Sequence, residues 1–280
     1  VWFAAALFLG LTWFELVWRK PGNPTHIGIV FILLMLITTG TRIIFSKASI
    51  EVDPLHLLHH LYAKLQFTVS KPIYKNMLEN IANLSNFKGM EYFILLMIGT
   101  VTYDGLRGTT FWYNLFGSST LDITFSTFAF FGINIVIIGS YRFACWFALK
   151  VSGEKQDLNN VSLLFGHTML PIAFAYHVTH YLSLLLYESQ TILYRLNDPY
   201  GIGWNLFGID DVSINYFLTP VALWGIQVFV TLAGHMLSVV LAHDLAIKLF
   251  GHQQSDKTQY IFLLITVGLT LQALFVLSVP

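Results

Sequence analysis

The run LDITFSTFAFFGINIVIIGSYRFACWFA, from Leu121 to Ala148, decides the fold class of this chain. Its charged residues are Asp122 and Arg142, and Phe, Ile, Val, Gly and Ala dominate the sequence between them. A helix that crosses a bilayer needs about 20 mostly apolar residues, and this run is long enough. With similar stretches elsewhere, the sequence predicts an all-α, polytopic transmembrane bundle of about seven spans. The predicted spans are Val1–Trp18, Ile27–Phe45, Glu91–Tyr103, Leu121–Ala148, Val161–Leu186, Leu218–Ala242 and Gln259–Val279.

The composition supports the same class. The chain has 280 residues, of which 55% are hydrophobic and 11% are charged, against about 25% charged in an ordinary soluble domain. So much apolar surface requires the lipid bilayer as solvent, and we interpret residues 1–280 as a single integral membrane domain. The formal net charge is zero, which argues against nucleic acid as a partner. Because Cys145 is the one cysteine, an internal disulfide and a CxxC redox pair are excluded.

The orientation follows from the distribution of basic residues between loops. Loops after the second, fourth and sixth predicted spans carry eleven Lys and Arg residues, whereas loops after the first, third and fifth carry four. The positive-inside rule places the first set in the cytoplasm of a multi-pass protein of the cell membrane. The chain opens on Val1 inside an apolar run, which we interpret as a processed or incomplete amino terminus.

Two loops are long enough to have structure of their own. Residues 46–90, on the cytoplasmic side, contain Asp53-Pro54, a good N-cap and first-turn pair for a helix. Such a helix would lie in the membrane interface, because its apolar and polar residues separate onto two faces. The apolar face is Leu58, Leu61, Tyr62, Leu65 and Val69, and the polar face is His56, His59, His60 and Lys64. Residues 187–217, on the outer side, are predicted to form an ordered, turn-rich cap loop.

Histidines are the most informative ionisable residues, because ionisable groups inside a membrane are expensive and usually functional. His177 and His180 are three residues apart on one face of the fifth span. His235 lies on the sixth span at a similar depth, in a polar stripe with Gln227, Thr231 and Ser238. These three imidazoles predict a mid-membrane site for copper, zinc, iron or haem.

Other histidines give weaker candidates for the same chemistry. His167, His243 and Asp244 form a second polar level nearer the cytoplasm, with Asp244 able to orient a histidine or relay a proton. His56, His59 and His60 match one histidine box of membrane di-iron enzymes. Those enzymes need several such boxes, so the solvated face of the interfacial helix is the preferred interpretation of these three residues.

The second half of the chain also resembles a known group of proteins. The resemblance rests on AYHVTHY (175–181), DPYG (198–201), WNLFG (204–208), Gly234-His235 and Ala242-His243-Asp244. This ordered combination is similar to a poorly characterised group of prokaryotic multi-pass membrane proteins, some of which are labelled "fenitrothion hydrolase". The resemblance covers roughly residues 92–250. It implies that His180, His235, His243, Asp244, Asp104 and the 198–208 loop belong to the group's pattern, whereas His177 departs from it.

Three functions are compatible with these observations, and no catalytic residue is assigned. The leading hypothesis is a membrane protein that binds a metal or haem through His180 and His235, helped by His177, as one subunit of a redox complex with other membrane subunits. The second is a proton-coupled transporter or channel, because histidine titrates near neutral pH. The third is an accessory or scaffold subunit whose histidines are structural. Since a GxSxG motif is missing from the sequence, a hydrolase would need a metal-activated water.

Overall fold

The computed structural model describes residues 1–18, 24–44, 49–65, 87–198, 202–209 and 212–278, and these ranges contain helices and no strands. The all-α prediction is therefore confirmed for the described residues. The helices are α1 (Trp2–Val17), α2 (Pro24–Ile44), α3 (Ser49–Val52), α4 (Pro54–Ala63), α6 (Met90–Arg107), α7 (Thr110–Phe116), α8 (Ile123–Ser152), α9 (Leu158–Thr168), α10 (Leu170–Leu186), α11 (Ile192–Asn197), α12 (Pro220–Phe250) and α13 (His252–Ser278). Short 3-10 turns cover Gly117–Leu121 and Glu188–Thr191.

Three of these helices, α8, α12 and α13, are long and apolar enough to cross a membrane. The pair α9 and α10 qualifies as a fourth span if it is counted as one helix with a bend of 42°. The described residues therefore form a helical structure with three or four candidate membrane spans, which is compatible with a membrane protein. Each of the other predicted spans also contains a helix, namely α1, α2 and α6. The count of seven spans stays a prediction.

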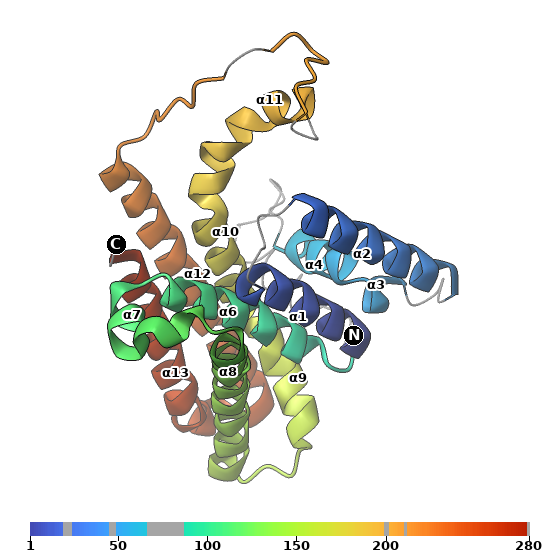
Figure 1. Ribbon diagram of the computed structural model, residues 1–280. Coiled ribbons are helices and arrows are strands. Elements are labelled where there is room, and N and C mark those ends of the chain that lie inside the picture. The colour runs from blue at the N-terminus through green and yellow to red at the C-terminus, as the bar shows by residue number, and fades with distance from the viewer. Residues whose placement is uncertain (19–23, 45–48, 66–86, 199–201, 210–211, 279–280) are drawn as a thin grey trace, which may run out of the picture.

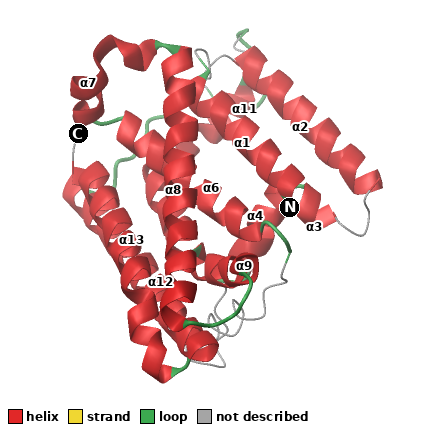
Figure 2. Cartoon of the chain, turned by 90° about the horizontal axis from the view of Figure 1, so that it is seen from below, coloured by secondary structure: helices red, strands yellow, loops and turns green. Residues whose placement is uncertain are grey.

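Helix α6 forms the centre of the bundle. It packs against α1, α8, α9, α10 and α13, and Figures 1 and 2 show it crossing between these helices. Its side chains are apolar on nearly all sides, and Phe93, Ile94 and Met97 are completely buried. A helix that is hydrophobic all round belongs in a core. The ends of α6 carry Glu91 and Asp104, so the core helix holds two carboxyl groups.

The predicted fifth span is two helices. Helix α9 ends at Thr168 and α10 begins at Leu170, with Pro171 in the first turn of α10. Proline lacks the N–H that a continuous helix would need there, which explains the break. The carbonyl oxygen of Thr168, left free by the break, accepts a hydrogen bond from Ser238 Oγ of α12 at 2.6 Å. Helix α12 therefore holds the bend in place.

Helix α4 begins where the sequence predicts. Asp53 caps it and accepts hydrogen bonds from the backbone N–H groups of Leu55 and His56. Leu57 and Leu61 are completely buried within the main apolar core, and α4 contacts α1. The apolar face of α4 is thus covered by protein, and a position in the membrane interface stays a prediction. Val69 and the rest of 66–86 lie outside the described residues.

The loop predicted to lie outside, residues 187–217, is ordered by side-chain hydrogen bonds over its described part. Asn197 Nδ2 donates to Asn205 Oδ1 and to the carbonyl oxygen of Ile209, each at 2.8 Å. The carboxylate of Asp198 accepts the N–H groups of Ile202 and Gly203. These contacts are those of a turn-rich segment. Figure 1 shows the chain between α11 and α12 arching away from the bundle. Residues 199–201 and 210–211 of the predicted loop lie outside the described residues.

Candidate functional site

The central feature of the site is the contact of His180, on α10, with the ion pair that Asp104 and Arg107 form on α6. His180 Nε2 lies 2.7 Å from Asp104 Oδ2, and Arg107 Nη2 lies 3.1 Å from Asp104 Oδ1. The His180 and Asp104 side chains are 28% and 19% exposed, so the pair is shielded but not sealed. The predicted site residue His180 is therefore joined to Asp104, and both residues belong to the pattern that the predicted resemblance implies.

Three helices position the pair. Asp104 and Arg107 lie three residues apart in the last turns of α6, so their side chains meet on one face. Arg107 also donates to the carbonyl oxygen of Leu16 near the end of α1. Gly105 lets α13 approach, because a Cβ added there would lie 2.8 Å from Val276. The carboxylate of Asp104 is thus fixed by neighbours on both sides.

The pair opens into a cavity of about 240 Å³ bounded by α1, α4, α6 and α10. Its walls are mixed: Leu, Val and Phe side chains alternate with polar and charged groups. The polar and charged members are Thr12, Glu15, Thr100, Asp104, His177, His180 and Tyr181. The cavity can therefore hold water or a small ligand directly against the ion pair.

His177 lines the same cavity, which confirms that it and His180 share one face of the helix. Its Nδ1 lies 2.9 Å from the carbonyl oxygen of Ala173, one turn earlier in α10. The imidazole ring packs edge-on against Tyr62 of α4, with ring centroids 6.1 Å apart. His177 therefore forms part of the cavity wall, whereas His180 is the histidine that contacts Asp104.

His235 has different neighbours. Its side chain is 3% exposed, its Nδ1 lies 2.9 Å from the Thr231 carbonyl oxygen, and its ring packs against Tyr176. Its Nε2 is buried and has no hydrogen-bond partner within the described residues. His235 is not among the residues that line the cavity around Asp104 and His180. Across the described part of the chain, no group of three or more His, Cys, Asp or Glu residues is placed to hold a metal ion. The assignment of His177, His180 and His235 as ligands stays a prediction.

The polar stripe on α12 ties this helix to its neighbours. Gln227 Nε2 donates to the Thr179 carbonyl oxygen at 2.8 Å, and Ser238 holds Thr168 as described above. Gly234 allows the contact, because a Cβ added there would meet Ala175 Cβ at 2.5 Å and the Pro171 carbonyl oxygen at 2.8 Å. Gln227 and Ser238, at the two ends of the stripe, therefore hold α12 against α10 and the break before it. Between them, His235 has an Nε2 without a hydrogen-bond partner within the described residues.

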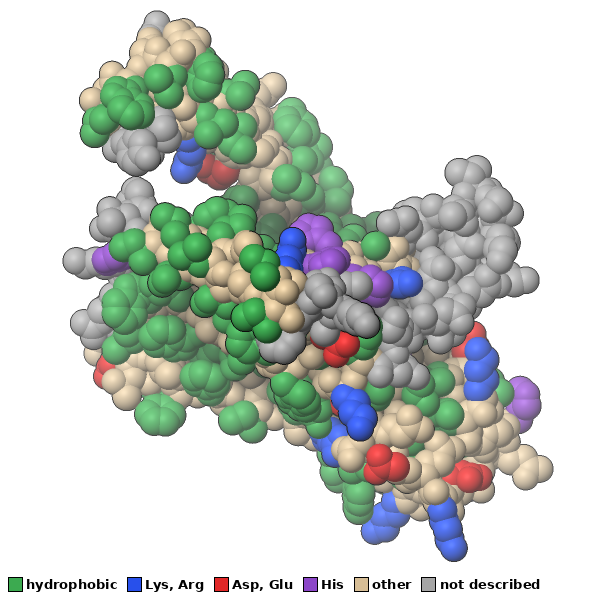
Figure 3. All heavy atoms as spheres, turned by 90° about the vertical axis from the view of Figure 1, so that its right-hand side faces the viewer, with side chains coloured by type: hydrophobic (Ala, Val, Ile, Leu, Met, Phe, Trp, Pro, Cys, Tyr) green, Lys and Arg blue, Asp and Glu red, His purple; other side chains and the backbone are tan. Residues whose placement is uncertain are grey.

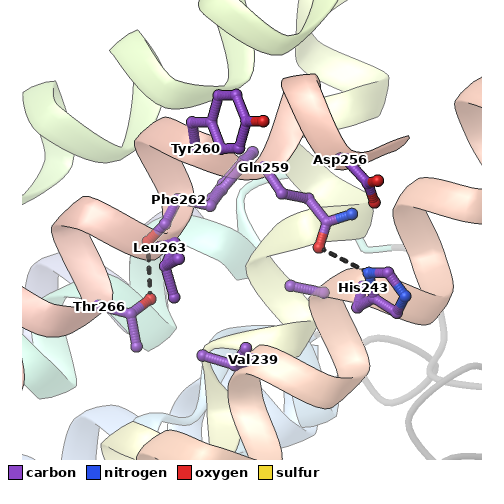
Figure 4. A pocket seen from close by; sticks show the side chains of 9 residues that line it. Val239, His243, Asp256, Gln259, Tyr260, Phe262, Leu263 and Thr266 are labelled. Carbon is purple, nitrogen blue, oxygen red and sulfur yellow. Dashed lines mark hydrogen bonds between the residues drawn. The ribbon is translucent and has the colours of Figure 1, made fainter. Parts of the chain in front are cut away.

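The second-level candidates, His167, His243 and Asp244, have different surroundings. His167 is 4% exposed, and its Nε2 has no hydrogen-bond partner in the described ranges. His243 is exposed instead and points toward α13, where its Nδ1 lies 3.1 Å from Gln259 Oε1 (Figure 4). It lines a separate cavity of about 360 Å³ with Asp256. Asp244 is half-buried and does not line that cavity.

The α4 histidines lie on an accessible face. His59 is exposed, and His56 and His60 are half-buried. Figure 3 shows histidine side chains gathered beside basic side chains on the face that carries α2, α3 and α4. Burial lowers the pKa of His60, and the nearby charges of Lys64 and His56 lower it further. These features agree with the preferred interpretation of a polar helix face, while a role as ligands is not tested.

Comparisons with family models, with curated proteins and with solved structures give no match for this chain. The resemblance to the prokaryotic membrane-protein group therefore stays a prediction. The site is defined by its own geometry alone.

Two residues of the site were missed by reasoning from the sequence, namely Glu15 and Arg107. Glu15 is the one charged residue in the predicted span Val1–Trp18. An isolated carboxyl in an apolar helix is a functional signal, so this residue could have been found. Arg107 was counted only as a loop charge, and its contact with Asp104 depends on where α6 ends.

Proposed function

We propose that the protein is a proton-coupled membrane transporter in which Asp104 and His180 bind the coupling proton. The observation that carries this proposal is the 2.7 Å contact between the two side chains across α6 and α10, next to a cavity. A histidine changes its charge near neutral pH, and a carboxylate at hydrogen-bond distance can stabilise its charged form. Such pairs inside membrane proteins mark proton pathways.

The chemistry needs only these residues. A proton taken up at His180 Nε2 converts the imidazole to an imidazolium, whose N–H donates to Asp104 Oδ2. Release of the proton leaves Asp104 with Arg107 as its remaining charged partner. The charge of the cavity wall therefore changes by one unit in each cycle, which would alter its affinity for a ligand or for the neighbouring helices.

The break between α9 and α10 supports the same function. Discontinuous helices are common in transporters, where they frame the binding site and allow two arrangements of the bundle. Here His180 lies on the second half of the broken pair, and α12 contacts both halves. A change in charge at His180 could therefore shift α10 relative to α9, because the two helices are not continuous.

Proton flux in liposomes tests the proposal. With an imposed pH gradient, an internal pH dye and a series of candidate co-substrates, liposomes containing the wild-type protein should lose the gradient faster than empty liposomes with at least one of them. His180→Gln and Asp104→Asn should slow this loss to the rate of empty liposomes, while His59→Gln, on the exposed face of α4, should behave as wild type. Equal flux in wild-type and empty liposomes, across a series of candidate co-substrates, would reject proton coupling.

The membrane arrangement is part of the proposal. The chain would cross the bilayer about seven times, with residues 46–90 in the cytoplasm and 187–217 outside, as the distribution of Lys and Arg favours. A tag inserted in 202–208 should react with an impermeant reagent from outside intact cells. Reaction only after the cells are opened would reverse the orientation.

A metal or haem role has one specific observation in its favour, and it concerns His235. Its Nδ1 faces a backbone carbonyl, which fixes the tautomer with the lone pair on Nε2, and that Nε2 has no partner within the described residues. Haem needs only one or two protein ligands, and a second could come from another membrane subunit. Metal analysis and an absorption spectrum on protein purified from its native membrane test this, with His235→Ala as the comparison. Equal metal content in wild type and variant would reject His235 as a ligand.

A further inference from the structure

An apolar groove runs along the outside of the bundle close to the site. It has a volume of about 580 Å³ and is bounded by α6, α7, α8 and α13. This volume is typical of sites for small organic ligands, which range over about 300–1,000 Å³. No charged residue is among those that line it. The groove therefore suits a neutral, largely apolar molecule.

The groove lies on the apolar outer surface of two candidate membrane spans. Two of its walls, α8 and α13, are candidate membrane spans, and only 17% and 11% of their most apolar windows are buried inside the protein. Phe128 and Val136 line the groove and are 74% and 68% exposed. A molecule would therefore reach the groove from within the bilayer.

The inner edge of the groove is polar. Thr102 of α6 and Gln272 of α13 lie there. Gln272 Oε1 is 3.5 Å from both the Thr102 hydroxyl and the Tyr176 hydroxyl, and Tyr176 itself donates to the Leu269 carbonyl oxygen at 2.7 Å. The Gln272 amide oxygen is thus turned toward hydroxyl groups. Its Nε2 is a donor and can therefore serve the acceptor of a ligand.

The same two residues connect the groove to the ion pair. Thr102 and Gln272 also line a small cavity of about 50 Å³ on their other side, and His180 lines that cavity too. His180 in turn lines the 240 Å³ cavity described above. The small cavity therefore shares Thr102 and Gln272 with the groove and His180 with the 240 Å³ cavity.

We propose that this groove is the access site for a neutral, lipid-soluble substrate that carries a hydrogen-bond acceptor such as a carbonyl oxygen. The apolar body lies against α8, and the acceptor receives a hydrogen bond from the Gln272 amide. The bound substrate is then separated from His180 by the 50 Å³ cavity that Gln272 and His180 both line. The inference rests on the proposed transport function, because it supplies the substrate class for the same site.

Photolabelling with benzophenone tests the groove directly, because this aromatic ketone is both a ligand of the proposed class and a crosslinker. The full chain, purified in detergent, is irradiated with increasing probe, and the labelled peptides are identified by mass spectrometry. Saturable labelling should map to residues 125–137 of α8. Fluorene, which has the same fused rings as fluorenone without the carbonyl, should compete about 2- to 12-fold more weakly than fluorenone, as expected for loss of one hydrogen bond.

Two glycines of α8 provide matched variants. Gly132 lines the groove, and a Cβ added there meets no atom within 4 Å, so Gly132→Leu fills the groove without disturbing the fold. Gly139 has equally open surroundings and does not line the groove. Gly132→Leu should abolish saturable labelling and Gly139→Leu should keep it. Gln272→Leu should weaken labelling by the same 2- to 12-fold factor.

Several results would overturn the inference. These are labelling that does not saturate, labelling of Gly132→Leu as strong as wild type, and competition by fluorene as strong as by fluorenone. Displacement of the probe by phospholipid as effectively as by fluorenone would identify the groove as a lipid site instead. Labelling needs no proton gradient. Saturable labelling without proton flux would therefore reject proton-coupled transport but support ligand binding in the groove. Proton flux without saturable labelling would support transport but reject ligand binding in the groove.

Discussion

A close contact between two helix backbones at Gly166 gives a sharp prediction. Gly166 of α9 lies against the start of α6, where a Cβ added to it would be 2.4 Å from Glu91 Cβ and 2.9 Å from Glu91 Cα. Carbon atoms in contact prefer about 3.5–4.0 Å, so the variant Gly166→Ala requires α9 and α6 to separate. A side-chain rotation cannot relieve the clash, because the atoms belong to the α6 backbone and to its first side-chain carbon.

The magnitude follows from other overpacked cores, where one inserted carbon costs about 1–3 kcal/mol. For chains of this size each kcal/mol lowers the melting temperature by about 2–4 °C, so Gly166→Ala should melt roughly 2–12 °C lower. The cost falls at the upper end because α6 is the central helix of the bundle.

Thermal unfolding in detergent, followed by circular dichroism, measures this effect. Gly139→Ala is the control, because its added carbon meets no atom within 4 Å and the melting temperature should stay within the error of wild type. Gly166→Ala and Gly139→Ala with the same melting temperature would refute the described packing of α9 on α6.

Three further predictions concern the cap of α4, the histidine face and the helix break. Asp53→Ala removes both the cap of α4 and the partner of Arg42, and should lower the unfolding free energy by about 0.5–2 kcal/mol. The control is Asp157→Ala, at a helix start where the side chain makes no capping bond, and this variant should lose less unfolding free energy. Equal losses in the two variants would contradict the capping geometry. Because the pKa of folded His60 is lowered below its usual value, the unfolded chain binds its proton more readily, so stability is complete above about pH 6.5 and declines as the pH falls below it. Melting curves between about pH 7.5 and 5.5 should show this decline in wild type and less of it in His60→Gln, and identical pH profiles would refute it. Ser238→Ala leaves the Thr168 carbonyl oxygen buried without its partner and should cost about 1–3 kcal/mol in the same unfolding assay, whereas a neutral effect would show that α12 does not hold the break.

Most of the helical fold could be predicted from the sequence, because apolar length alone determines where helices form in a bilayer. Each of the seven predicted stretches contains a helix in the structure. The break at Met169 was not predicted, since Pro171 alone does not say whether a helix bends or ends. The apolar face of α4 was predicted in part, but a face that suits lipid suits a neighbouring helix equally well, and here it packs on protein.

The site was predicted less completely, for a physical reason. Helical periodicity relates residues within one helix, so it correctly placed His177 and His180 on one face. It says nothing about rotation between helices, which decides that His180 meets Asp104 while His235 meets Tyr176. His180 and His235 were predicted to share one site because they lie at a similar depth in the membrane. A similar depth does not determine whether two side chains also meet within the plane of the membrane.

A double-mutant cycle on Asp104 and His180 tests the central claim most directly. The unfolding free energies of wild type, Asp104→Asn, His180→Gln and the double variant are measured in the same detergent. If the two side chains form the pair described, the double variant loses less than the sum of the single variants by at least about 0.5 kcal/mol. Losses that add within about 0.3 kcal/mol would show two independent residues, and the proton-binding pair would not exist.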